Sequence, residues 1–166
     1  MKQHIFAALF APTLVSADIS VAFYESAPKD RFVIKNDLCT LDEAVIIIDL
    51  ATAPAGLIFD VTASGAGVEV FQPVRVEGNP TLDPLVLDGD QKLEVRLPSF
   101  GRNQELIITA DIDDTLENSD LGQIRVSGAE IAGTRAAIIS EKGAVWGAMD
   151  ERGKTTLTGS IDCLTS

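Results

Sequence analysis

Apolar and polar residues alternate along many short segments of this chain, whereas sustained helical spacing is hard to find. Alternation puts every second side chain on one face, which is typical of a half-buried β-strand. Residues 92–97 show it most clearly, and residues 18–24 and 31–35 repeat it. Turn formers separate further candidate strands at 44–50, 56–61, 68–71, 74–77, 105–112, 123–128, 135–139, 144–148 and 154–158. The pattern predicts a single-domain, all-β fold, an antiparallel β-sandwich of the Ig-like or jelly-roll-like kind.

Two segments allow a helical interpretation. Thr40 could cap a helix whose first turn holds Asp42 and Glu43. The β-branched run at 45–48 favours a strand instead, because such side chains lose freedom in a helix and pack well on a sheet. Residues 115–120 are expected to form a short helical turn.

The first 17 residues have the features of a signal peptide. Lys2 precedes an apolar run from Ile5 to Val15, and Val15-Ser16-Ala17 fits the small-residue cleavage pattern. The run is too short to cross a bilayer, which takes about 20 residues. We therefore expect residues 1–17 to be removed, residues 18–166 to form the β-sandwich domain, and the mature chain, which holds no further apolar span, to be periplasmic or extracellular.

The chain is strongly acidic. It has 25 acidic and 13 basic residues, and loss of Lys2 leaves 12 basic ones. Nucleic acid is therefore an unsuitable partner. An acidic surface keeps an exported protein soluble, or it collects divalent cations; solubility is the simpler interpretation.

Cys39 and Cys163 are the only cysteines. In an oxidising compartment an even count predicts a disulfide, and only one pairing exists. The alternative is two separate buried thiols.

The sequence lacks the side chains of the commonest catalytic sites. His4, the single histidine, lies in the expected signal peptide, so the mature chain has no imidazole for acid–base, nucleophilic or zinc chemistry. We therefore expect a non-enzymatic protein that interacts with an unknown protein or glycan at the cell surface. The alternative is a carbohydrate-binding module or a glycoside-acting enzyme that uses paired carboxylates.

A cluster of carboxylates follows the apolar segment at 105–112. Asp111 and Asp113 would point to the same side of a strand, with Asp114 at the turn and Glu25 or Asp30 near them if the first two strands lie alongside. Such a set of hard oxygen ligands suits Ca²⁺, although the spacing is not that of an EF-hand loop. Alternatively, these side chains only cap turns.

Two other features have simpler interpretations. Asp88-Gly89-Asp90 is typical of a hairpin turn. Trp146 could stack on a sugar, but a lone tryptophan next to Val145 is expected in the core.

Several segments resemble a known family. They are Asp18 to Glu25, Ala27 to Phe32, Gly56 to Thr62, Gly67 to Pro73 and Asp111 to Thr115. They resemble the aggregation factor core proteins, small exported proteins of marine alphaproteobacteria. The resemblance implies an exported, adhesive protein and transfers no catalytic residues.

If the signal peptide is removed as expected, N-terminal sequencing of the exported protein will begin at Asp18. Recovery of Met1 from that fraction would contradict the cleavage.

Overall fold

A computed structural model describes residues 18–68, 70–119 and 121–163; the expected signal peptide lies outside these ranges. The fold is an antiparallel all-β single domain, as the sequence predicts. The strands in chain order are β1 (Ile19–Tyr24), β2 (Asp30–Asn36), β3 (Leu41–Asp49), β4 (Ile58–Phe59), β5 (Arg75–Val76), β6 (Lys92–Phe100), β7 (Gln104–Ala110), β8 (Ile112–Asp113), β9 (Arg135–Ser140), β10 (Gly143–Ala148) and β11 (Lys154–Ile161).

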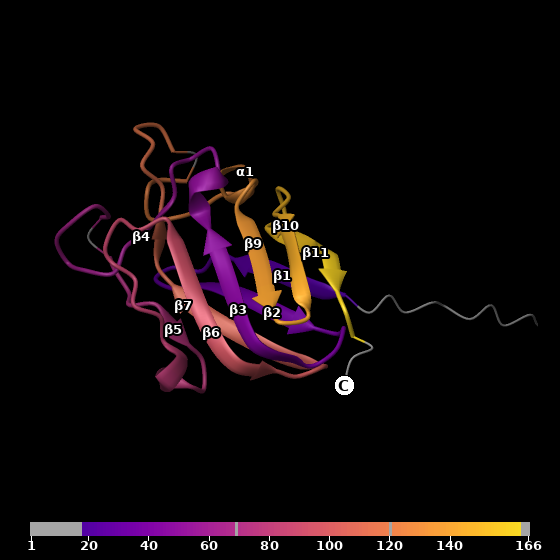
Figure 1. The fold of residues 1–166 in the computed structure, drawn as a ribbon. Coiled ribbons are helices and arrows are strands. Elements are labelled where there is room, and N and C mark those ends of the chain that lie inside the picture. The colour runs from indigo at the N-terminus through magenta and orange to yellow at the C-terminus, as the bar shows by residue number, and fades with distance from the viewer. Residues whose placement is uncertain (1–17, 69, 120, 164–166) are drawn as a thin grey trace, which may run out of the picture.

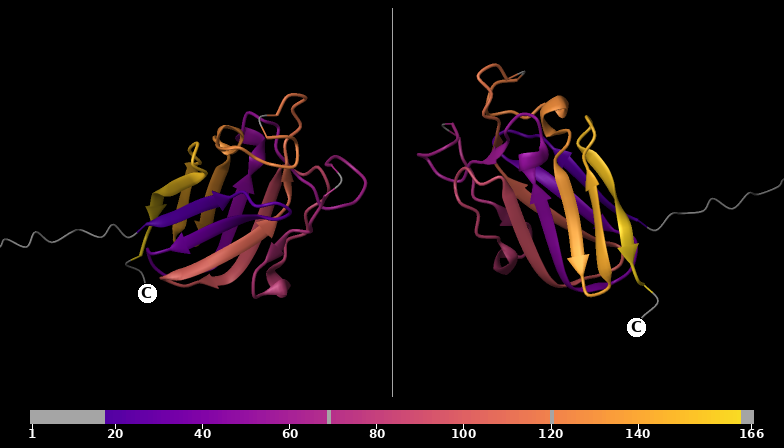
Figure 2. Two further views of the ribbon diagram at one scale, coloured as in Figure 1. Left: turned by 180° about the vertical axis from the view of Figure 1, so that it is seen from behind. Right: turned by 45° about the horizontal axis from the view of Figure 1, so that its top comes forward.

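One curled sheet forms most of the molecule. Nine strands follow the order β5-β7-β2-β1-β11-β10-β9-β3-β6, and β4 pairs with β8 in a separate ladder. β11 joins the two halves, because its first residues pair with β1 and its last residues pair with β10. In Figure 1, β1 and β2 cross behind β3, β9 and β10, and in the view from behind in Figure 2 they lie in front. The two halves therefore face each other and enclose the core.

The alternating segments point their apolar residues into this core. In β6, Leu93, Val95 and Leu97 are buried, whereas the charged residues that alternate with them are exposed, namely Lys92, Glu94 and Arg96. The same alternation buries Phe32 and Ile34 of β2. Burial of such side chains on both inner faces provides the main stabilising free energy of the fold.

Some boundaries differ from the sequence prediction. Residues 44–49 of the segment predicted at 44–50 belong to strand β3, which rejects the helical alternative, and residue 50 begins a short 3-10 helix. The segment at 123–128 is no strand, and it leads into α1 (Gly128–Ile131), whose capping box joins Ser127 and Glu130. The described residues of 68–71 and 115–120 form neither a strand nor a helix. No helix among the described residues is long and apolar enough to span a membrane.

Two short 3-10 helices complete the described elements. The first is η1 (Leu50–Thr52), which directly follows β3, and the second is η2 (Pro80–Leu82). Asp49 and Asn79 cap them, because each side chain accepts a hydrogen bond from the backbone N–H two residues on. These caps satisfy backbone donors at points where the chain leaves the sheet.

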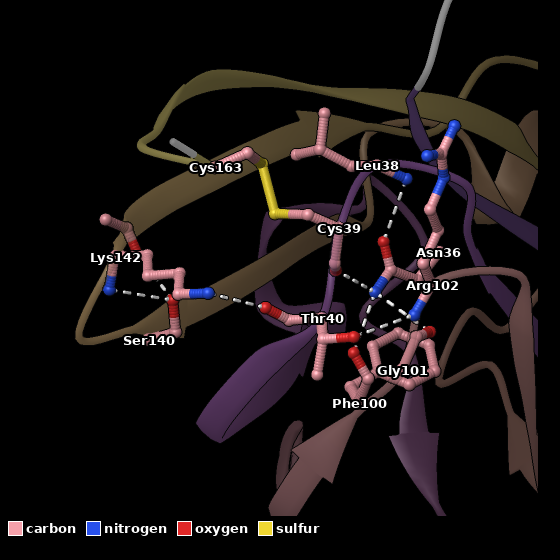
Figure 3. Close-up of a disulfide and its surroundings, with 11 residues drawn as sticks. Asn36, Leu38, Cys39, Thr40, Phe100, Gly101, Arg102, Ser140, Lys142 and Cys163 are labelled. Carbon is pink, nitrogen blue, oxygen red and sulfur yellow. Dashed lines mark hydrogen bonds between the residues drawn. A yellow bond between two sulfur atoms is a disulfide. The ribbon is translucent and has the colours of Figure 1, made fainter. Parts of the chain in front are cut away.

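Cys39 and Cys163 form the predicted disulfide, with their Cα atoms 5.9 Å apart. The bond ties the segment before β3 to the chain two residues beyond the end of β11 (Figure 3). Beside it, the buried Asn36 donates hydrogen bonds to the carbonyl oxygens of Cys39 at 2.7 Å and Phe100 at 2.9 Å. Its own Oδ1 accepts a bond from the Leu38 N–H. Asn36 and the disulfide together hold three chain segments in one place.

Replacing both cysteines with serine should destabilise the fold by about 3 to 5 kcal/mol, because the bond closes a long loop of 124 residues. The measurement is chemical denaturation of both proteins with and without reductant. Reductant should lower the stability of the natural protein to that of the variant and leave the variant unchanged. Equal stability of the two proteins under oxidising conditions would contradict this role.

Candidate cation site at the β4–β8 ladder

The short β4–β8 ladder fixes the orientation of the aspartate side chains at its end. Phe59 lies opposite Ile112, and both are fully buried in the core. One step along, the Asp60 N–H donates to the Asp111 carbonyl at 3.1 Å. Because neighbouring positions alternate between faces, Asp60, Asp111 and Asp113 share the face opposite the two core side chains. Because Phe59 and Ile112 are fixed in the core, the three carboxylates have to lie close together on the opposite face.

Asp60 is the most unusual of these residues. Its side chain is completely buried, and neither of its oxygens accepts a hydrogen bond of good geometry, although the carboxyl groups of Asp88 and Asp113 and the Thr62 N–H lie close to it. Burial raises the pKa of Asp60 to about 6, and the nearby charges of Asp113 and Asp88 add to the shift. A Cβ on Gly67 would overlap the Asp60 carboxylate, so the loop of residues 62–68 covers this group and only glycine fits there.

Asp88 holds that loop in place. Its Oδ1 accepts hydrogen bonds from the backbone N–H groups of Val61 at 3.0 Å and Thr62 at 3.1 Å, and its Oδ2 accepts one from Ala66 at 2.7 Å. These bonds favour the charged form and lower the pKa of Asp88. The Asp88-Gly89-Asp90 segment is a turn, but the predicted hairpin is wrong, because the strands before and after it, β5 and β6, pair with β7 and β3 and not with each other. Through its bonds to the loop, Asp88 also keeps residues 62–68 over Asp60.

The predicted ligands Asp111 and Asp113 lie beside Asp60, Asp114 follows Asp113, and all three are buried. Asp113 accepts the Val68 N–H at 2.8 Å, and Asp114 accepts the Leu116 N–H at 2.9 Å. Each of the three keeps one buried oxygen without a hydrogen bond. Burial, followed by the charge of Asp113, raises the pKa of Asp111 to about 7.

The structure also places Asp30 at this cluster. It begins β2 and accepts hydrogen bonds from the backbone N–H groups of Ser26 at 3.0 Å and Ile112 at 3.3 Å. Its pKa is raised to about 7, mainly by burial. Glu25 is used differently, because both of its oxygens bond to the Arg125 guanidinium, at 2.8 and 3.0 Å. Asp30 is therefore the better candidate of the two for a ligand.

The sequence pattern does not identify Asp60 as part of the cluster. Its neighbours in the cluster are about 50 positions away, and a two-residue ladder brings them together. The glycines at 65 and 67 were a weak signal, since they allow a loop to approach a carboxylate closely.

The negative charges of this carboxylate cluster have to be neutralised. Buried carboxylates without donors are stable only when a proton or a cation compensates their charge. Within the described ranges, no three histidine, cysteine or acidic side chains already lie in the arrangement that a bound metal ion requires. A cation would have to draw the carboxylates closer, whereas protons can bind them as they stand.

No family model, no curated protein and no solved structure matches the chain. The resemblance to the aggregation factor core proteins accordingly stays a prediction from the quoted segments, and the function has to be inferred from the cluster itself.

Proposed function

We propose that this protein is an exported, calcium-binding β-domain that acts by binding a partner and not by catalysis. The observation that carries the proposal is Asp60, a buried carboxylate whose two oxygens accept no hydrogen bond of good geometry and whose charged neighbours are other carboxylates. An ionised group of this kind costs several kcal/mol unless an opposite charge compensates it. A divalent cation would supply that charge.

The donor atoms favour calcium among the common metal ions. Carboxylate oxygens are hard ligands, and Ca²⁺ accepts six to eight of them in irregular geometries, whereas Mg²⁺ demands a near-ideal octahedron. The expected ligands are Asp60, Asp111 and Asp113, with Asp30 and Asp114 at the margin. Zinc is less suitable, because both cysteines are joined in the disulfide.

The proposed location outside the cytoplasm is supported by the same disulfide, since such bonds persist in oxidising compartments. The acidic composition is consistent with a soluble exported protein. We expect the partner to be a protein or glycan at the cell surface, in an adhesive role. The facing halves of the curled sheet support the sandwich description, of the Ig-like or jelly-roll-like kind.

The alternative of a glycoside-acting enzyme is less favoured by the burial of the carboxylates. A glycosidase needs two carboxyl groups that reach the scissile bond from both sides of the sugar. Asp60 and Asp113 are 0% and 1% exposed, beneath the loop of residues 62–68. A panel of chromogenic glycosides should therefore show no hydrolysis, and turnover that Asp60→Asn abolishes would favour the enzyme.

In calcium-free buffer, stability should fall as pH rises from about 4 to about 8. Unfolded aspartates have a pKa near 3.8, whereas the folded pKa is about 7 for Asp111 and about 6 for Asp60. Between these values the folded state holds protons that the unfolded state has released, so rising pH favours unfolding. Denaturation in EDTA at several pH values measures the slope, which Asp111→Asn should reduce. Asp37→Asn, at an exposed position, is the matched control, and a slope of zero would refute the raised pKa values.

Calcium should reverse this loss of stability at neutral pH. A cation at 100 times its dissociation constant adds roughly 2.7 kcal/mol, which raises the melting temperature by several degrees. Weak extracellular sites require titration to about 10 mM. Magnesium at equal ionic strength should have a smaller effect.

The Asp60→Asn variant distinguishes a calcium site from a carboxylate cluster that is neutralised by protons alone. At pH 8 in EDTA the variant should melt higher than the natural protein, because it removes an uncompensated buried charge. It should also lose the calcium response, whereas Asp37→Asn should keep it. If Asp60→Asn responds to calcium as the natural protein does, or if calcium and magnesium act equally, the proposed site is wrong.

A further inference from the structure

The lone tryptophan lies on the outer face of the sheet and not in the core. Trp146 in β10 is 56% exposed, whereas its neighbours Val145 and Gly147 are buried. The expectation of a core tryptophan is therefore wrong. Because adjacent strand residues point to opposite faces, Val145 and Trp146 cannot both point inward. A single exposed apolar side chain is common on a protein surface, so the significance of Trp146 depends on the residues around it.

A groove lies beside this ring. Ala137 of β9 is opposite Trp146 on one side and opposite Ile47 of β3 on the other. The small alanine between two larger side chains leaves an open cavity of about 410 Å³. Ala136 and three charged residues complete its lining; the charged residues are Asp49, Lys92 and Arg135.

The groove carries a positive group in an acidic protein. The Arg135 guanidinium lies 5.7 Å from the centre of the Trp146 ring, and it forms no ion pair with any described residue. Asp49 faces it across the ladder but instead accepts the Ala51 N–H at 3.1 Å. Lys92 is paired with Glu94 at 3.0 Å. Arg135 is thus available for an anionic ligand on a chain whose net charge is −12.

We propose that this groove binds an acidic saccharide, a sugar that carries a carboxylate. The indole ring of Trp146 provides the flat apolar surface on which a pyranose ring stacks. The planar guanidinium of Arg135 matches a carboxylate with two parallel hydrogen bonds. Asp49 lies at the same end of the groove and accepts bonds from sugar hydroxyls.

The size and charge of the groove favour a saccharide over other ligands. Small-molecule sites range from about 300 to 1,000 Å³, which includes this cavity. A protein partner needs about 800 Å² of surface on each side, whereas the apolar strip of Ile47, Ala137 and Trp146 is bordered by charged residues of β6. β4 and β10 lie at different sides of the molecule (Figure 1). The other end of the groove, at Lys92, is two residues from Asp90, whose carbonyl oxygen accepts the Phe59 N–H at 2.8 Å. The binding test is therefore made without calcium.

Trp146 is the only tryptophan, so its fluorescence reports on this groove directly. The probes are tetragalacturonate and a neutral galactose tetramer, each titrated to about 10 mM in EDTA with calorimetry in parallel; weak sites have dissociation constants near 1 mM. The acidic probe should give a saturable change in emission and bind at least roughly ten-fold more tightly than the neutral one. EDTA removes the calcium that could bridge the acidic probe to the aspartates.

Substitutions in the groove test whether the acidic probe binds there. Ala137→Leu fills the groove, and Arg135→Gln removes its free charge; each should weaken binding at least roughly ten-fold. Arg96→Gln is the matched control, since Arg96 lies on the same outer face but does not line the cavity. Asp113→Asn should bind the probe normally, which separates this site from the proposed calcium site. Absence of both heat and emission change, equal binding of the neutral probe, or equal loss in Arg96→Gln would overturn the proposal.

Discussion

The double pairing of β11 is the constraint on which the rest of the structure depends. One half of this strand bonds to β1 and the other to β10, so a single hydrogen-bonded sheet turns back on itself. Apolar side chains of both halves then bury each other, while every second residue stays outside. Both candidate sites follow from this curl, because the acidic ladder lies beside the closed core and the tryptophan lies on its convex face.

The core also explains why an unfavourable cluster of charges persists. Phe59 and Ile112 are fully buried, and their burial is worth several kcal/mol. Asp60 and Asp111 then have to occupy the opposite face of the same ladder, even though burial of their charges is unfavourable. Hydrophobic burial on one side of a two-residue ladder can therefore stabilise carboxylates that repel one another on its other side.

Alternation in the sequence predicted the strands well, because the two-residue period is a local property of the chain. It also placed Asp111 and Asp113 on one face. Alternation could not predict that Asp60 lies in the cluster, because its contact with Asp111 and Asp113 depends on tertiary pairing across about 50 positions. It also could not predict the ion pair of Glu25 with Arg125, since these two residues lie in loops that are distant in the sequence. The wrong prediction for Trp146 has another cause. A core position is typical of a lone tryptophan, but the alternation with the buried Val145 places the ring on the outer face, and the alternation determines its position.

The disulfide has a mechanical consequence. Cys163 lies just beyond the end of β11, and its partner Cys39 lies just before β3. A pulling force on the C-terminal residues reaches the covalent bond before it reaches the hydrogen bonds of β11. The load passes into the segment that leads to β3, and β11 cannot be peeled away residue by residue from its own end. A domain tethered or pulled through its C-terminus would keep its curled sheet closed under tension.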